Sequence, residues 1–187
     1  MSIGVLASDR PRLGTVTLDP EDPVVAGTVG TWRVCLVVGS YGIDEGGTVK
    51  MARRFASDWE EPQFERPGDA GYTTVRTTGA ARLSIRYDSK GHVRPWMRCI
   101  VIDVYDGSLA PGDVIEVVLG DRSGGSPGIR AQSFQESAHE LRVLVDPTNA
   151  CLVREVERSP VIPIVAGEAA TIVCIMPSDV AVGESTD

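Results

Sequence analysis

A glycine-rich loop carries the side chains with the clearest chemical potential in this sequence. Residues 110–132 read APGDVIEVVLGDRSGGSPGIRAQ, and Asp121, Arg122, Arg130 and Gln132 stand around four glycines and a proline. Backbone N–H groups of such loops can form concave anion sites, with arginine as the charge partner. The sequence therefore predicts a ligand site at these four residues. The alternative is a structural corner locked by an Asp–Arg pair.

Trp59, Trp96 and His92 are the other candidate ligand-binding residues. An indole ring beside carboxylates and arginine suits a carbohydrate-like ligand, because the apolar face of a sugar stacks on the ring. The alternative for both tryptophans is packing in the core. His92 titrates near neutral pH, which suits acid–base chemistry. Its alternative is an exposed histidine in the turn after Lys90-Gly91.

No motif assigns a reaction, a metal or a cofactor. The loop lacks the Gly-Lys-Ser/Thr ending of a P-loop, and no Gly-X-Ser-X-Gly segment stands between a strand and a helix. The four cysteines are far apart and the two histidines form no pair with ligand spacing. We therefore predict no metal and no cofactor, and leave the catalytic residues unassigned.

Short β-like runs, separated by glycine and proline turns, must position these residues. Runs 72–77 and 81–87 predict a hairpin across Thr78-Gly79. Run 96–105 is expected in the centre of a sheet and covered on both faces, because its middle is continuously apolar. Residues 132–141 could hold a short helix. The other runs are 31–38, 48–55, 114–119, 141–145, 151–156, 161–165 and 171–176.

This pattern predicts an all-β fold, an antiparallel β-sandwich of the immunoglobulin or jelly-roll kind. Residues 1–24 are expected as an N-terminal extension and residues 25–158 as the sandwich domain. Residues 159–187 are expected as a linker followed by an incomplete, Ig-like strand region. A long polar loop over 58–71 is expected to be functional or disordered.

Charge and hydropathy limit the partners. The chain of 187 residues has 18 basic and 26 acidic residues, a net charge of −8. This balance argues against nucleic acid and anionic membranes as partners. No apolar run reaches the ~20 residues of a membrane span, and no signal peptide is evident. The expected location is the cytoplasm. Arg82 and Arg86 alternate with apolar residues, so they are expected to face solvent or a partner.

Several segments together resemble a known family. They are 30–32 (GTW), 41–47 (YGIDEGG), 54–59 (RFASDW) with Pro62-Gln63, 91–96 (GHVRPW) and 106–132. They resemble the N-terminal β-rich region of large bacterial proteins of unknown function, over about residues 25–177. In that family an Ig-like segment and a PHP-like, metal-dependent hydrolase-type domain follow. The tail from Gly167 resembles the start of the Ig-like segment, and the catalytic region has no counterpart here.

These observations lead to two functional expectations. The first is a cytoplasmic, non-catalytic accessory subunit or binding module that associates with a larger catalytic chain or with itself. The alternative is an enzyme, or half of one, acting on a glycoside or other polyhydroxylated small molecule. In that case Asp121, Arg122 and Arg130 bind the substrate and Trp59 or Trp96 stacks on it.

Overall fold

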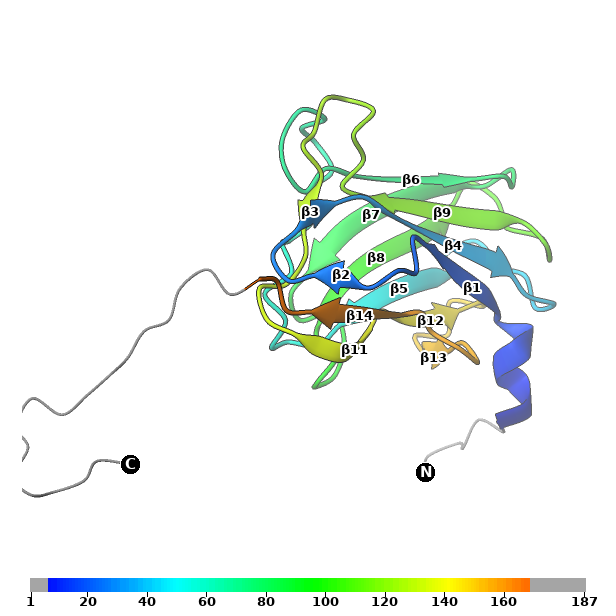
Figure 1. Cartoon of the computed structure of the whole chain (residues 1–187). Coiled ribbons are helices and arrows are strands. Elements are labelled where there is room, and N and C mark those ends of the chain that lie inside the picture. Colours follow the sequence, from blue (N-terminus) through cyan, green and yellow to red (C-terminus); the bar gives the residue numbers. More distant parts are fainter. Residues whose placement is uncertain (1–6, 169–187) are drawn as a thin grey trace, which may run out of the picture.

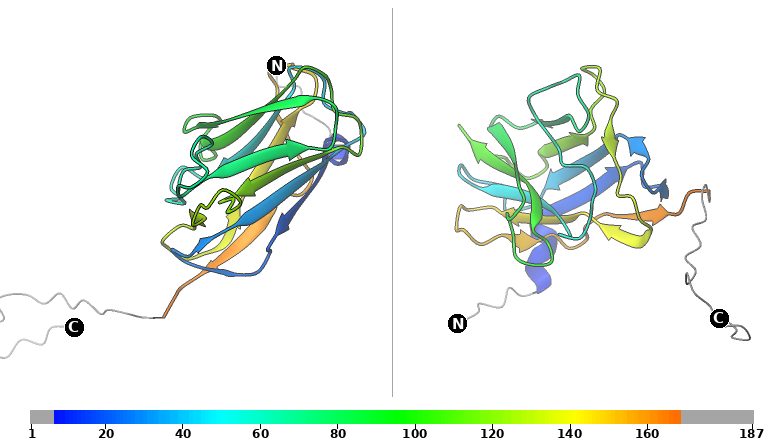
Figure 2. Two further views of the ribbon diagram at one scale, coloured as in Figure 1. Left: turned by 90° about the horizontal axis from the view of Figure 1, so that it is seen from above. Right: turned by 90° about the vertical axis from the view of Figure 1, so that its left-hand side faces the viewer.

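The computed structural model describes residues 7–168, in which two antiparallel sheets face each other across a shared core (Figure 1). Two smaller sheets, one of two strands and one of three, complete the sandwich. Figure 2 shows the arrangement from above and from the end that carries the two long loops. The prediction of an all-β antiparallel sandwich is confirmed. Within the described residues, no helix has the length and apolar character needed to cross a membrane.

The first sheet has four strands in the order β1-β4-β9-β6. They are β1 (Gly14–Asp19), β4 (Trp32–Val38), β9 (Val114–Leu119) and β6 (Thr73–Thr77). Alternation along β4 explains its two faces, because side chains on a strand point alternately to opposite sides. Trp32, Val34 and Leu36 are buried, whereas Arg33 and Val37 are exposed. One face therefore enters the core and the other meets solvent.

The second sheet has five strands in the order β13-β12-β5-β8-β7. They are β13 (Arg154–Glu155), β12 (Arg142–Asp146), β5 (Thr48–Arg53), β8 (Arg98–Tyr105) and β7 (Arg82–Asp88). Ile100 and Ile102 of β8 enter the main core, while Val101 packs in a smaller cluster on the outer face. The prediction that this run is covered on both faces is confirmed. β7 forms an edge of the sheet, with Arg82 and Arg86 exposed as expected.

The two small sheets join segments that are far apart in the sequence. β10 (Ile129–Arg130) pairs with β3 (Val29–Gly30), and β14 (Val161–Val165) lies between β11 (Glu136–Glu140) and β2 (Val24–Val25). The β14–β2 pair is parallel, with Ile164 beside Val24. A short 3-10 helix, η1 (Ala7–Arg12), precedes β1. Thus β1 lies within the segment expected as an extension, and β14 within the segment expected as a linker. The strand expected over 171–176 lies outside the described residues.

Two local predictions are wrong. Strands β6 and β7 form no hairpin, because β6 pairs with β9 and β7 pairs with β8 in the opposite sheet. Residues 78–81 cross between the layers, with Gly79 packed against Leu109 and Asp113. Residues 132–141 form no helix, because the segment pairs as β11 with β14 through a bulge between Glu136 and His139. Side-chain periodicity could not reveal either of these partners.

Candidate functional site

Two long loops lie against each other at one end of the sandwich (Figure 1). Residues 54–72 connect β5 to β6, and residues 120–135 contain the glycine-rich segment with β10. Backbone hydrogen bonds join them at Glu60 N to Arg130 O, 3.0 Å, and at Gly71 N to Gly128 O, 2.9 Å. The predicted long loop is therefore an ordered part of the fold. It meets the segment that carries most of the predicted site.

Asp121 organises the corner through its carboxylate. Its carboxylate accepts hydrogen bonds from Thr74 Oγ1 at 2.6 Å and from Ser123 N at 2.8 Å. These bonds, the one from Thr74 above all, hold the pKa of Asp121 below its usual value. Arg122 turns away, toward Val29 O at 3.4 Å, and is exposed. The predicted Asp–Arg pair is replaced by an aspartate that ties the loop to β6.

Arg130 belongs to a second set of contacts. Its backbone N donates to the Glu60 carboxylate at 2.8 Å, and its guanidinium lies 3.8 Å from Asp58 Oδ2. Asp58 also accepts hydrogen bonds from Ser133 Oγ, 2.5 Å, and Ser133 N, 2.8 Å, which lower the pKa of the Asp58 carboxyl. The charge of Arg130 is therefore partly satisfied by its own chain. These contacts of Asp58 and Glu60 with Arg130 and Ser133 hold the two loops together.

Gln132 is fully buried and faces a histidine–glutamate pair that the sequence did not reveal. Its Nε2 donates to Phe134 O and to Glu136 Oε2, both at 3.1 Å. Glu136 Oε2 also lies 3.0 Å from His139 Nδ1. His139 is only 2% exposed, and burial lowers its pKa although Glu136 opposes this shift. Gln132 therefore helps to orient the partly exposed Glu136.

Trp59 packs beside this pair in the core. Its ring stacks on His139 at 5.1 Å between centroids and meets Trp32 edge-on at 4.8 Å. Arg53, itself buried, donates to Glu60 O through both terminal nitrogens at 3.3 Å, and burial lowers its pKa to about 10. The cavity between Arg53, Trp59 and His139 has about 10 Å³. Small-molecule sites have about 300 Å³ or more, so this cavity is too small to hold a small molecule.

Trp96 and His92 lie elsewhere, at the outer face of the five-stranded sheet. Trp96 is 6% exposed, with the Arg142 guanidinium 4.0 Å and that of Arg54 5.3 Å from its ring centroid. Burial, and then the charges of Lys50 and Arg142, lower the pKa of His92. Because arginine covers the ring of Trp96 and core residues cover that of Trp59, neither offers a free face to a sugar.

The seven predicted site residues thus fall into four places, at the glycine corner, beside Asp58, in the core around His139, and on the outer face of the five-stranded sheet. Within residues 7–168, no cluster of three His, Cys, Asp or Glu side chains has the arrangement of a metal site. No protein-family model matches the sequence, and a search of curated proteins finds no match.

Two of the open grooves in the described part of the chain have volumes of about 600 Å³ or more, and among the seven predicted residues Arg122 lines one of them. The first, about 600 Å³, lies between β2, β3 and the turn before β2, with Trp32 and Val24 among its lining residues and Arg122 and Asp22 as its charged groups. Beside it lies an apolar surface on β14, β2 and β3. We call this surface the valine stripe; it consists of Val25, Val29, Val161 and Val165.

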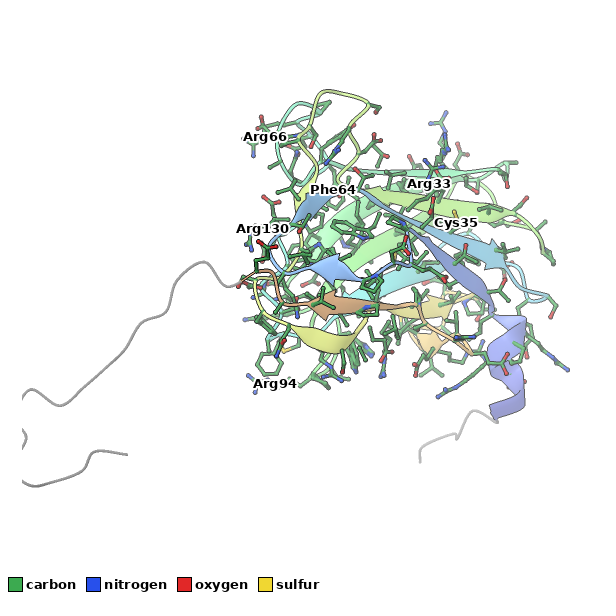
Figure 3. All side chains as sticks on the ribbon, in the orientation of Figure 1. Arg33, Cys35, Phe64, Arg66, Arg94 and Arg130 are labelled. Atoms are coloured by element: carbon green, nitrogen blue, oxygen red, sulfur yellow. The ribbon has the colours of Figure 1, made fainter. Side chains whose placement is uncertain are left out.

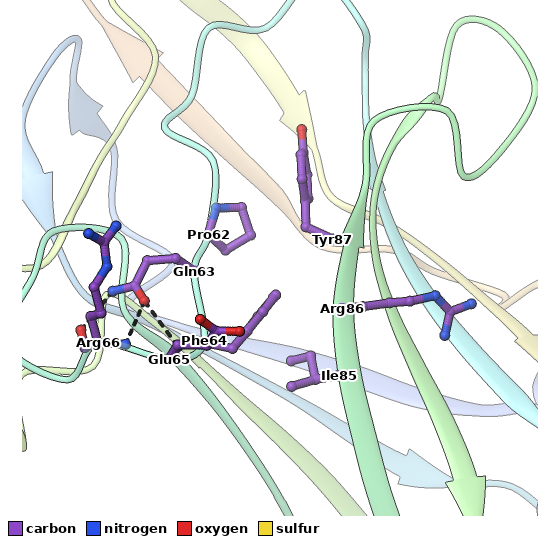
Figure 4. Close-up of a pocket in the computed structure, with 8 residues that line it drawn as sticks. All are labelled: Pro62, Gln63, Phe64, Glu65, Arg66, Ile85, Arg86 and Tyr87. Atoms are coloured by element: carbon purple, nitrogen blue, oxygen red, sulfur yellow. Dashed lines mark hydrogen bonds between the residues drawn. The ribbon is translucent and has the colours of Figure 1, made fainter.

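The second groove, about 660 Å³, separates residues 62–66 from the edge strand β7 (Figure 4). Pro62 and Phe64 face Ile85 and Tyr87 across it, and Arg86 points away. Gln63 builds the far wall, because its side-chain amide bonds to the backbone of Glu65 and Arg66. The alternation along β7 is visible in the sequence, but nothing there indicates which loop lies opposite. Figure 3 shows Arg66 and Arg130 at this same end of the molecule.

Proposed function

We propose that this chain is a non-catalytic binding module that docks on a larger, catalytic protein chain through the valine stripe and the adjoining groove. The observation that carries the proposal is the exposure of four valines, 41–44% each, on neighbouring strands. Apolar side chains that are exposed near one another are common at interaction sites. The candidate catalytic groups, by contrast, are buried or bonded within the chain.

The shape of the surface fits a protein partner better than a small molecule. Val161 and Val165 point to the same side of β14, and Val165 lies beside Val25 in the parallel pair. Val29 follows one turn later, where Thr28 N donates to Val25 O at 3.1 Å. The groove next to Val25 and Val29 is lined by Pro20 and Pro23, which suit an apolar anchor. Arg122 at its rim suits a carboxylate on the partner.

Two further observations agree with the proposal. The cysteines that the structure describes, Cys35, Cys99 and Cys151, are free thiols, as expected in the reducing cytoplasm. The resemblance to the β-rich region of large bacterial proteins favours a partner with a PHP-like, metal-dependent hydrolase-type domain. In this proposal the module shapes or covers the partner's surface and contributes no reacting group.

The test is affinity purification of the tagged chain from its own host, with two variants in parallel. Val25→Asp/Val29→Asp places charge on the stripe, and Val37→Asp is the matched control, because Val37 is 37% exposed on β4 of the other sheet. We expect one larger protein to co-purify stoichiometrically with the wild type and the control and to be lost with the double variant. Thermal melting verifies that each variant folds.

Two results would contradict the proposal. One is a wild-type chain that retains no stoichiometric larger partner. The other is a partner that binds equally well to the Val25→Asp/Val29→Asp variant. A hydrolase activity measured on this chain alone, free of any partner, would overturn its non-catalytic role.

A further inference from the structure

Strand β7 is an open edge whose charges complement themselves. It has seven residues, Arg82–Asp88, and pairs only with β8 among the described strands. An unpaired edge exposes backbone donors and acceptors to any second strand. Natural edges are commonly short, bulged or covered, whereas β7 pairs with β8 in unbroken register from Arg82 to Asp88. It is therefore available for strand addition.

We propose that two copies of this chain associate through β7, antiparallel, with Ile85 of one copy opposite Ile85 of the other. A two-fold axis normal to the sheet would join the two five-stranded sheets into one continuous sheet. This surface is separate from the valine stripe, so the proposal does not depend on the proposed function.

Charge selects the register. Directly opposed residues in an antiparallel pair point to the same face, so only registers that preserve the faces are possible. Centring on Ile85 places Arg82 opposite Asp88 of the second copy, twice per dimer. Centring one residue earlier, on Ser84, places Arg82 opposite Arg86. Centring on Arg86 places that residue opposite itself. Like charges directly opposed destabilise a pair, so the Ile85 register is favoured.

The apolar face of β7 agrees with the same register. Leu83, Ile85 and Tyr87 are partly buried against the core and point to the inner side. In the Ile85 register, Leu83 of the second copy lies opposite Tyr87 and its Ile85 lies opposite Ile85. Tyr87 and Ile85 line the open groove of about 660 Å³ together with Pro62 and Phe64 (Figure 4). The inner side chains of one copy would therefore fill the groove of the other.

The contacts within one copy leave the required groups accessible. Arg82 pairs with Asp106 at 3.3 Å, but both side chains are about 70% exposed, 71% and 68%. Asp88 uses one oxygen to accept from Lys90 N at 2.8 Å. Arg86 is paired with Asp103 of the neighbouring strand and is not required across the axis. Arg82 and Asp88 are six residues apart on one strand, about 20 Å, so they cannot pair within a copy.

The experiment measures the mass of the full chain in solution by light scattering and sedimentation over a dilution series. The wild type is expected to sediment as a dimer. Arg82→Asp opposes Asp88 with a like charge, and Asp88→Arg opposes Arg82. Each is expected to raise the dimer dissociation constant about tenfold or more, because both symmetry-related pairs change. The combined swap Arg82→Asp/Asp88→Arg is expected to restore the dimer.

A control separates this effect from a general change of charge. Arg33→Asp alters an arginine that is 50% exposed on the outer face of the other sheet (Figure 3) and is expected to leave the dimer intact. A wild-type monomer at every concentration overturns the proposal. So does a dimer that both single variants preserve, or a swap that fails to restore what the single variants lose. All four variants lie on the surface, and circular dichroism verifies their fold.

Discussion

Substitution of Gln132 tests whether this predicted ligand residue acts inside the protein. Gln132→Met keeps the side-chain length and removes two hydrogen bonds, to Phe134 O and Glu136 Oε2. Their loss costs about 1 kcal/mol for the neutral acceptor and about 2 for the charged one. The change also removes Oε1, which is buried without a partner and whose desolvation costs about 1–3 kcal/mol. The expected net destabilisation is therefore only about 1 kcal/mol.

Gln132→Glu provides the contrast. The shape is nearly unchanged, but an ionised carboxylate donates no hydrogen bond and would lie beside Glu136 in a fully buried position. Burial of an unpaired charge makes the expected cost about 3 kcal/mol or more at pH 7. In the Met variant Glu136 loses one hydrogen bond but gains no like-charged neighbour, and His139 at 3.0 Å and Arg54 at 3.6 Å still contact it.

Urea unfolding followed by tryptophan fluorescence measures both variants, with equal slopes required for a valid comparison. The reasoning fails if the Met variant loses more than about 3 kcal/mol, or if the Glu variant stays within about 1 kcal/mol of the wild type at pH 7. The Met variant should also leave binding of the proposed partner unchanged, because Gln132 has no exposed surface.

Three further predictions follow from single contacts. Burial lowers the pKa of His139 in the folded state, so the unfolded chain binds the proton first as the pH falls. Stability should therefore fall as the pH drops below about 6.5, the pKa of a histidine in the unfolded chain. Thermal melting from pH 8 to 5 should show a smaller change of melting temperature with pH for His139→Gln than for the wild type. Gly120 has φ +67°, and a Cβ there would meet the backbone within 2.6 Å, so Gly120→Ala should lower the melting temperature steeply, whereas Gly125→Ala, with open space around it, should lower it less. In a Cys174→Ser background, exposed Cys151 should react with a thiol reagent at once and Cys99 only on unfolding, since Cys99 is buried and its thiol pKa is raised to about 11; equal rates would contradict the burial.

The sequence was most predictive where local pattern decides the structure. The alternation of β4 and β7 and the apolar centre of β8 indicated their strands and faces, because a side chain's side of the sheet follows from its position alone. The two-residue strands β2, β3 and β10 carry too little pattern to be recognised. The partner of β6 depends on a strand some 40 positions away, Thr77 beside Ile115, which no local signal shows.

The site was harder to predict for the same reason. Asp121 and Gln132 have the residue types of a ligand site, but their partners Thr74 and Glu136 come from pairings that only the fold creates. The possibility of a structural corner was raised, although the aspartate is bound by a threonine instead of an arginine. The burial of His139 depends on its position opposite Ile162 of β14. A bulge sets that register, and nothing in the sequence revealed it.

The parallel pair of β2 and β14 has a consequence for how the chain folds. It joins residues 24 and 164, so the loop it closes spans 140 positions, nearly the whole described chain. Closing so long a loop delays the contact, since its entropy is lost before the contact compensates for it. During synthesis Val24 and Val25 leave the ribosome well before Ile164 and Val165, so their partner strand is made about 140 residues later. The same pair has only two residues on one side, as do the β3–β10 and β12–β13 pairs, so it should be among the first to open when the folded protein fluctuates. Hydrogen exchange should therefore find some of the fastest paired amides there, beside the surface proposed to bind the partner.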